Sequence, residues 1–245
     1  MQIVEAATRP DLADAREDMM GHLWPGFMHE DPVADRHWHR LARDFAPFQL
    51  FAVADDGTLA GVGNAIPFHW SGRDADLPDT GWDGVLEQGA ADSDAGRAAT
   101  ALSALAITLA PEHRGQGLAD RMIGAMKAAA AAHGLTALVA PVRPTWKARY
   151  PLTPIDRYAA WRRDDGAPFD PWVRTHWRAG ARLVRLAPQS MIITGRVAEW
   201  EEWTGMAFPD TGDYVVPGAL APVAIDRAAD IGRYVEPNLW MHHPA

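Results

Sequence analysis

The sequence predicts a mixed α/β fold built on one central sheet, and three observations lead to that prediction. Segments with strand patterns alternate with helical segments along most of the chain, which indicates that strands and helices share one sheet. An apolar run, the turn Asp55-Asp56-Gly57 and a second apolar run are typical of a β-hairpin. The 245 residues are 48% apolar and 22% charged, and no stretch has the composition of a linker. We therefore expect residues 1–245 to form a single domain.

The first hundred residues predict three strands and two helices. The expected elements are a strand over 2–6, helices over about 10–23 and 33–45, and strands over 49–54 and 59–68. Pro10 and Asp11 suit the first turn of a helix, because proline fits there and an acid favours the helix dipole. Residues 71–98 are rich in Gly, Asp and Ala, and we expect an inserted loop there with one helical turn near 84–88. A loop of that length in a compact domain is often functional.

The second part of the chain contains the clearest helix. Leu118, Met122, Ile123 and Met126 fall on one face, and Gly134 stands where a left-handed residue ends a helix. The expected elements are strands over 101–109 and 135–142 around a helix over 118–133, an inserted loop over 144–170, a helix over 169–179, strands over 182–186 and 191–194, and an extension over 196–245.

Composition excludes several function classes. The chain has no cysteine, so it can hold no disulfide, thiolate nucleophile or Cys-ligated zinc. The net charge of −9 disfavours nucleic acid as a partner. We see no signal peptide and no apolar run long enough for a membrane span, so a cytoplasmic protein is expected. His37 and His39 do not share a helix face, and His242-His243 is interpreted as a frayed tail, so no metal is predicted.

One motif carries chemistry, and it lies between the strand over 101–109 and the helix over 118–133. Gly115 and Gly117 allow the backbone to approach a ligand closely, and the helix N-terminus adds positive potential to that of Arg114. This arrangement is suited to holding an anion. The spacing is neither a Walker A loop nor G-x-G-x-x-G. It reads Arg114-x-x-Gly117-x-Ala119.

This motif resembles the signature [Q/R]-x-x-G-x-[G/A] of the GNAT superfamily of N-acyltransferases. The resemblance implies a mixed, mostly antiparallel sheet with one splayed strand pair and flanking helices. It also implies acetyl-CoA or another acyl-CoA as co-substrate and a primary amine as acceptor. The residues that would bind acyl-CoA are Arg114, Gly115, Gln116, Gly117, Leu118 and Ala119 for the pyrophosphate, and Ile107, Thr108 and Leu109 for the pantetheine arm.

The catalytic residues are less defined by the sequence. The family commonly places a Tyr as thiol donor four residues before a Gly-Phe pair, and counting back from Gly180 gives His176. Tyr150 and Tyr158 are the rivals for that role. The sequence does not single out one general base. Ser103 could relay a proton through water, and the other candidates are Glu87, Asp92, Asp94 and Asp156.

The acceptor side is predicted from aromatic and acidic residues. The 11 tryptophans are absent from residues 101–126, so we assign the surplus to the acceptor side. Aromatic rings with carboxylates suit a cationic, small-molecule amine. The resemblance places the acceptor at two segments, which contain Trp24, Phe27, His29, Glu30 and Asp31, and then Glu199, Trp200, Glu201, Glu202 and Trp203. Of these acids, Glu201 and Glu202 are expected to be solvated. The alternative to an enzyme is a non-catalytic acyl-CoA sensor on the same fold, and a homodimer is possible.

Overall fold

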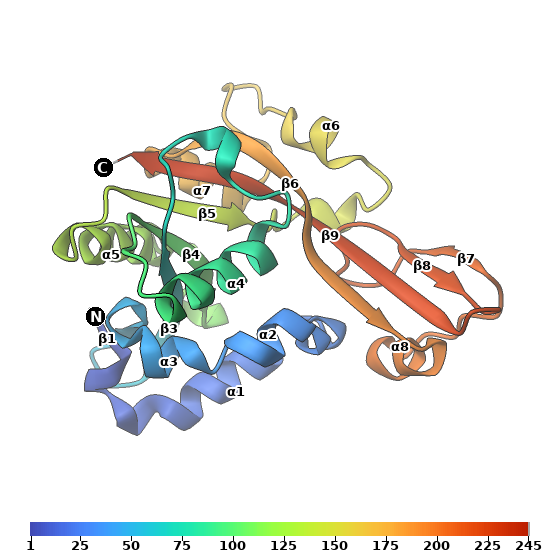
Figure 1. The fold of residues 1–245 in the computed structure, drawn as a ribbon, viewed down its shortest axis with the longest axis horizontal. Coiled ribbons are helices and arrows are strands. Elements are labelled where there is room, and N and C mark those ends of the chain that lie inside the picture. The colour runs from blue at the N-terminus through green and yellow to red at the C-terminus, as the bar shows by residue number, and fades with distance from the viewer. Residues whose placement is uncertain (245) are drawn as a thin grey trace.

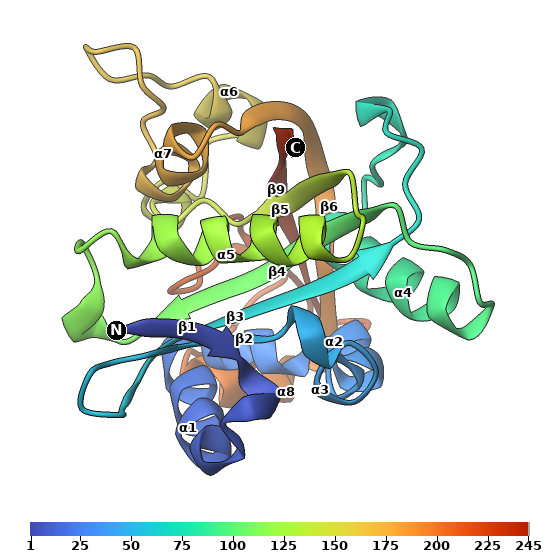
Figure 2. The same ribbon diagram turned by 90° about the vertical axis from the view of Figure 1, so that its left-hand side faces the viewer.

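The computed structural model describes residues 1–244 as a large sheet with helices on both faces (Figures 1 and 2). Its strands are β1 (Gln2–Glu5), β2 (Leu50–Val53), β3 (Leu59–Phe68), β4 (Ala101–Leu109), β5 (Ala137–Val142), β6 (Arg182–Gly195), β7 (Gly212–Tyr214), β8 (Val223–Asp226) and β9 (Ile231–Pro244). Its α-helices are α1 (Ala13–Leu23), α2 (Pro32–His37), α3 (Arg40–Asp44), α4 (Gly81–Asp94), α5 (Leu118–Ala132), α6 (Ile155–Ala159), α7 (Pro171–Arg178) and α8 (Val197–Thr204).

The strand order confirms the predicted mixed, mostly antiparallel sheet. The order is β1-β2-β3-β4-β5-β9-β8-β7, and β6 also pairs with β9. Every pair is antiparallel except β4 with β5. The expected hairpin is β2 and β3, joined by the turn at residues 55–57.

Helices α4 and α5 cover opposite faces of this sheet, as the contacts of two β3 residues, Gly63 and Ile66, show. A Cβ on Gly63 would touch Met122 and Met126 of α5, whereas a Cβ on Gly89 of α4 would touch Ile66. Because side chains alternate along a strand, residues 63 and 66 point to opposite faces. Figure 2 shows α5 in front of β3 and β4, with α1 to α3 on the other side.

A second hydrophobic core lies away from the main one. Strands β6 and β9 continue beyond β5 and form an arm with β7, β8 and α8 (Figure 1). Trp200, Phe27 and Tyr234 are among the buried residues of this core. The turn over residues 26–30 therefore ties the α1 side of the molecule to the arm.

The prediction of a loop over 71–98 is wrong, because α4 occupies residues 81–94. Glycines made this segment a weak helix candidate, since each lowers helix propensity by roughly 1 kcal/mol. The structure shows why two of them stand there. A Cβ on Gly81 would lie 2.3 Å from Ser190 Oγ, and one on Gly89 would lie 2.7 Å from Ile66. These glycines allow α4 to approach the sheet closely.

The helix expected over 33–45 is in fact two short helices, α2 and α3, which are separated at Trp38 and His39. The indole of Trp38 stacks on that of Trp82, with ring centroids 5.7 Å apart. In the segment expected to be the loop 144–170, the structure adds the short helix α6.

The expected extension over 196–245 and the expected frayed tail are both wrong for residues 231–244. These residues form β9, which pairs with β5 and β6 inside the sheet. His243 is fully buried. The sequence pattern concealed this strand because it buries Glu236, Asn238 and His243, polar residues that usually stay at the surface. The two strands expected over 182–194 are one strand, β6, with an irregularity between Ala187 and Met191.

Two Gly→Ala substitutions should change stability in opposite directions. A Cβ on Gly232 would lie 2.2 Å from Trp200 Cδ1, whereas a Cβ on Gly124 in α5 meets nothing within 4 Å. We expect Gly232→Ala to lower the free energy of unfolding by about 1–3 kcal/mol, as overpacking does. Gly124→Ala should raise it by about 0.5–1 kcal/mol. Urea unfolding of both variants checks this, and equal effects would contradict the packing of Trp200 on β9.

Candidate active site

The predicted anion-binding loop connects β4 to α5 and leaves its backbone open. Gly115 and Gly117 have φ values of 73° and 77°, a region that non-glycine residues rarely adopt. Gly117 is the N-cap residue of α5, so no side chain caps the first N–H groups. Residues 114–117 are exposed, and a Cβ on either glycine would meet nothing within 4 Å. The loop fits a pyrophosphate, because free N–H groups at a helix N-terminus bind anions.

The side chains of this loop hold its shape. Arg114 Nε donates to the Leu109 carbonyl at 3.1 Å, and Gln116 Nε2 donates to the Glu112 carbonyl at 2.7 Å. Leu118 is buried and Ala119 is half-buried at the start of α5. The Arg114 N–H donates to the Pro111 carbonyl at 3.2 Å, so the backbone donors left for an anion are the N–H groups of residues 115–119.

Strands β4 and β5 separate soon after they start. They share only two pairs of residues, Leu102 with Leu138 and Ser103 with Val139. On its other edge, β4 contains a bulge: Asn64 pairs with Ala106 and Ala65 pairs with Ala104, so Leu105 is the extra residue. A bulge bends a strand and redirects its backbone groups. Ile107, Thr108 and Leu109 therefore border a gap on the β5 side, as the predicted splayed pair requires.

A hydrogen-bonded chain of polar groups reaches this bulge, and no sequence pattern predicted it. Trp82 Nε1 donates to the Leu105 carbonyl at 3.0 Å, and the Trp82 N–H donates to Ser190 Oγ at 2.8 Å. Ser190 in turn donates to Asn238 Oδ1 at 2.7 Å, and Asn238 Nδ2 donates to Glu236 Oε1 at 3.1 Å.

Glu236 anchors the far end of that chain. Its carboxylate is fully buried and accepts from Arg143 Nε and from the Tyr234 hydroxyl, at 2.8 and 2.9 Å. Such a buried ion pair needs further hydrogen bonds to offset its desolvation. The chain from Glu236 to Trp82 supplies them, so it fixes the position of Trp82 against the β4 bulge.

Ser103 and Thr108 point to the α4 side of the sheet. Ser103 pairs with Ile66 and Thr108 with Val62, and Ile66 contacts α4. Both hydroxyls are buried, and neither has a hydrogen-bond partner among residues 1–244. Buried hydroxyls are usually satisfied, so each is available to a bound molecule or water.

Tyr150 lies at the edge of an aromatic cluster that follows β5. Its ring is 5.0 Å from that of Trp161 and 6.1 Å from that of Tyr158, and the residue is 37% exposed. Tyr158 is buried and donates to Asp170 Oδ2 at 2.8 Å. Burial and the Asp170 charge raise the pKa of Tyr158, so it stays protonated and engaged.

His176 is buried against the C-terminal strand. Its Nδ1 lies 2.9 Å from His243 Nε2, and burial lowers the pKa of His176 to about 3. A histidine with that pKa is neutral near pH 7 and holds no extra proton to donate. Among residues 1–244, no hydrogen bond joins Ser103, Tyr150 and His176.

Most of the acids considered as bases have structural partners. Glu87 pairs with Arg36 and Asp94 with Arg40, both at 2.6 Å, and Asp92 accepts from the His69 N–H at 2.8 Å. Asp156 is exposed in α6.

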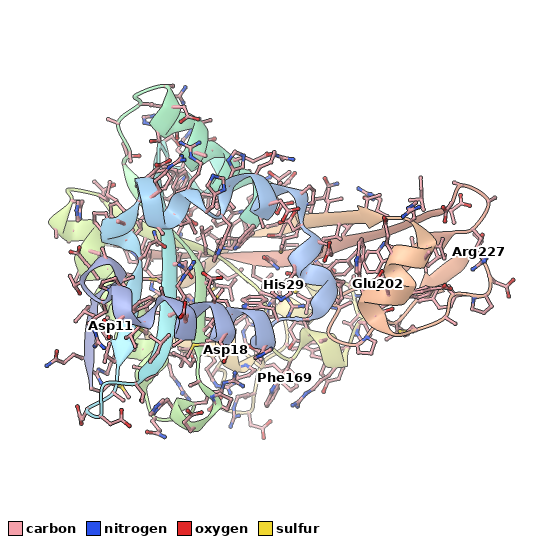
Figure 3. All side chains as sticks on the ribbon, turned by 90° about the horizontal axis from the view of Figure 1, so that it is seen from below. Asp11, Asp18, His29, Phe169, Glu202 and Arg227 are labelled. Carbon is pink, nitrogen blue, oxygen red and sulfur yellow. The ribbon has the colours of Figure 1, made fainter. Side chains whose placement is uncertain are left out.

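The acceptor-side residues divide into two groups. Trp200 is fully buried against Phe27, with ring centroids 5.7 Å apart, and Trp203 contacts Trp200. The assignment of these two indoles to the acceptor is therefore wrong, since they pack the second core. His29 and Glu202 are exposed where the 26–30 turn meets α8, as Figure 3 shows. Asp31, in contrast, is fully buried at the start of α2.

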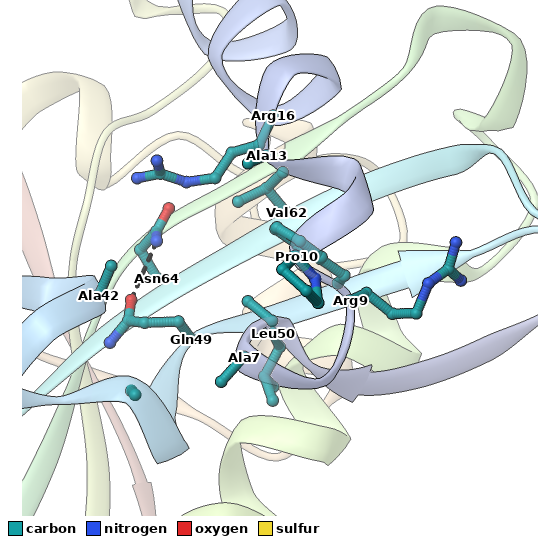
Figure 4. Close-up of a pocket in the computed structure, with 13 residues that line it drawn as sticks. Ala7, Arg9, Pro10, Ala13, Arg16, Ala42, Gln49, Leu50, Val62 and Asn64 are labelled. Atoms are coloured by element: carbon teal, nitrogen blue, oxygen red, sulfur yellow. Dashed lines mark hydrogen bonds between the residues drawn. The ribbon is translucent and has the colours of Figure 1, made fainter.

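A separate small pocket of about 160 Å³ lies between α1 and strands β2 and β3 (Figure 4). Asn64 Nδ2 donates to Gln49 Oε1 at 2.9 Å there, and Asn64 Oδ1 has no partner among residues 1–244. Most of the accessible lining is apolar. The pocket is smaller than the usual 300–1,000 Å³ of a small-molecule site.

Within the described residues, no three or more His, Asp or Glu side chains are arranged to hold a metal ion. No helix in residues 1–244 combines the length and the apolar composition that a membrane span needs.

Comparisons with known proteins agree with this geometry. The model of the acetyltransferase (GNAT) family matches residues 10–152. The chain is 36% identical to an arginine N-acetyltransferase, avaD, of Aspergillus versicolor, over 98% of this chain and 92% of that protein. These findings favour a transferase over the non-catalytic sensor.

Solved structures share the fold at low identity. A GNAT-like decarboxylase, GphF, in complex with isobutyryl-CoA matches with a TM-score of 0.61 and 16% identity, over 100% and 99% of the two chains. The loading GNAT-like domain of CurA from Lyngbya majuscula matches with a TM-score of 0.55 and 17% identity, over 84% of this chain and 81% of that one.

The buried histidine pair should make the fold sensitive to acid. Burial lowers the pKa values of His176 and His243 to about 3 and about 4, whereas an unfolded histidine titrates near 6.5. The unfolded chain thus binds more protons below about pH 6.5, and the free energy of unfolding falls from there towards pH 4. His176→Gln should make that fall shallower, as measured by urea unfolding at pH 7 and pH 5. An unchanged slope would contradict this assignment.

Proposed function

Because the chain belongs to the GNAT acetyltransferase family and transfers an acyl group from acyl-CoA to an amine, we propose that its acceptor is a small molecule with a guanidinium group. The acceptor would be arginine or a close analogue. Two observations support this class: the similarity to an arginine N-acetyltransferase, and the acidic net charge of −9. A guanidinium stays protonated at neutral pH, so the nitrogen that attacks is the α-amine.

The observation that carries the assignment of the acyl-CoA site is the separation of β4 from β5 beside the glycine loop. Strand pairing stops after Ser103, and the exposed loop over 114–117 follows β4 directly. An extended pantetheine arm can pair with a free strand edge, in the way that peptides add to sheets. We assign Ile107, Thr108 and Leu109 to that arm, and the N–H groups of residues 115–119 to the pyrophosphate, since the Arg114 N–H donates to the Pro111 carbonyl.

The acyl-CoA supplies an activated thioester, and the chain supplies binding, orientation and proton transfer. The amine nitrogen bonds to the carbonyl carbon, the carbon–sulfur bond breaks, the nitrogen loses a proton and the thiolate gains one. Backbone N–H groups near the β4 bulge are suited to stabilise the carbonyl oxygen. We assign a direct transfer, which agrees with the absence of a cysteine that could carry an acyl group.

For the proton steps, we assign the thiolate donor to Tyr150 rather than to His176. Tyr150 is 37% exposed on the segment after β5, whereas His176 is buried and neutral. The free hydroxyl of Ser103 lies on β4 and can position a water for the amine. A cytoplasmic location and a homodimer remain predictions.

Replacing Gly117 by valine should abolish tight CoA binding. Its φ of 77° disfavours a β-branched residue, and the new side chain would crowd the N–H groups that face the pyrophosphate. Gly134→Val is the matched control, because Gly134 has a φ of 73° at the other end of α5. Both variants should lose stability, but only Gly117→Val should weaken CoA binding at least tenfold in calorimetry. Equal CoA affinities would overturn the loop assignment.

Arginine should be acetylated faster than neutral amino acids of similar size. The test measures thiol release from acetyl-CoA with L-arginine, L-citrulline and L-norleucine, and mass spectrometry locates the acetyl group. We expect the highest kcat/KM for arginine and a product acetylated on the α-amine. Equal rates with norleucine would contradict the proposed acceptor class.

A further inference from the structure

Two buried carboxyl groups face each other beside the candidate active site. Asp31 at the start of α2 and Asp83 in the first turn of α4 lie where these two helices pack together. Arg36 of α2 pairs with Glu87 of α4 at 2.6 Å, and the Trp38 indole stacks on that of Trp82. Each carboxyl influences the ionisation of the other. Asp31 also caps α2 by accepting from the Val33 N–H at 3.1 Å, and Asp83 Oδ2 accepts from the Ile192 N–H at 3.1 Å. Interacting like charges in a buried site cannot both ionise, so the pair holds a proton.

The pair has an unused hydrogen-bonding atom and no cation. Asp83 is 7% exposed, and its Oδ1 has no partner among residues 1–244. No Arg or Lys of the described chain forms an ion pair with either carboxyl. The charges of Asp35 on α2 and Glu87 on α4 further raise the pKa values of the two carboxyls, and Glu87 is itself paired with Arg36 at 2.6 Å. Buried acids are normally paired, so this cluster lacks a cationic partner.

The pair is adjacent to the point where β4 leaves β5. Trp82, the residue before Asp83, donates its indole N–H to the carbonyl of the bulge residue Leu105. Trp38, which follows α2, stacks on that indole. Trp82 therefore connects the bulge of β4 to the residue that carries the Asp83 carboxyl.

We propose that Asp31 and Asp83 bind the guanidinium of the acceptor, an inference that rests on the proposed function. A guanidinium offers five N–H donors in a planar fork, which suits two carboxylates and the free Oδ1 of Asp83. Its binding releases the proton that the pair holds to solvent and leaves both carboxylates ionised against one cation. Binding requires the segment that carries Asp31 to open, because Asp31 is fully buried.

The experiment compares arginine with citrulline, which has a neutral urea group of nearly the same shape. Calorimetry measures their binding to the CoA-bound enzyme, and initial rates give kcat and KM. The variants are Asp83→Asn and Asp31→Asn, because asparagine imitates a protonated carboxyl and keeps the cap of α2. The control is Asp35→Asn, which removes an exposed acid on α2 near the pair.

The wild-type protein should bind arginine more tightly than citrulline. Each pair variant should lose about 10- to 100-fold in arginine affinity, the size of a lost hydrogen bond to a charged group. Citrulline binding should stay within about twofold, since the loss concerns the cation alone, and Asp35→Asn should keep the preference for arginine.

Three outcomes separate the proposals. If arginine binds with the expected preference and is not acetylated, the proposed function is wrong and the subsite stands. If arginine is acetylated and the variants keep the wild-type preference, the subsite is wrong and the function stands. If Asp83→Asn lowers kcat equally for arginine and citrulline with KM unchanged, the pair acts as a base, which overturns the binding role.

The Tm of the Asp83→Asn variant, measured together with its arginine affinity, separates loss of the binding site from misfolding. Burial and the neighbouring Asp31 raise the pKa of Asp83 to about 9, far above its unfolded value near 4. The native state then holds more protons between those values, and the free energy of unfolding falls as pH rises through that window. Asp83→Asn should raise Tm at pH 8 while arginine affinity drops. A lower Tm together with weaker binding of both ligands would indicate misfolding and contradict the subsite.

Discussion

The parallel contact between β4 and β5 is the constraint on which the rest of the structure depends. The two strands share only two residue pairs, and each is then held by an antiparallel neighbour on its other side, β3 for β4 and β9 for β5. The bulge at Leu105 increases the bend of β4 at that point. Because each strand is held from outside, the gap between them stays open without a loss of sheet pairing elsewhere.

The buried polar groups around this gap are costly for a fold to maintain. Glu236 needs Arg143, Tyr234 and Asn238 to be satisfied, and Asp83 keeps one oxygen without a partner. An apolar replacement for such groups is often neutral or stabilising by about 1–4 kcal/mol. Their presence on the elements next to the gap is typical of sites where stability is given up for binding. The two hydrophobic cores on either side provide the burial that tolerates this loss.

Local patterns predicted the elements of the sheet from β1 to β5, together with α5 and its glycine loop. These elements have short sequence separations and clear periodicity, so the sequence alone indicates them. Helix α4 and strand β9 were missed because their residue types are chosen for contacts that only the folded chain makes. Gly81 leaves room for Ser190, and His243 contacts His176. In each pair the two residues lie more than 60 positions apart in the sequence.

The same reason applies to the site. The loop over 114–119 is contiguous, so its pattern can be read from the sequence. Trp82 and Asp83 in α4 and Glu236 in β9 come from two distant segments that no sequence pattern links. Two residues also differ from their predicted roles. Trp200, assigned to the acceptor side, packs a hydrophobic core, and His176, the candidate thiol donor, is buried against His243. An indole or imidazole in a single sequence does not reveal whether its neighbours are solvent or another buried ring.

The position of β9 has a consequence for how the chain is made. The sheet joins β5 to β6 and β8 only through residues 231–244, so about 90 residues separate β5 from its partner strand. During synthesis, β5 is already complete while its partner has yet to be translated, and one edge of β5 stays open. Exposed strand edges promote pairing with other chains, and contacts of long range form slowly. The yield of native protein should therefore depend on how quickly the last strand is delivered.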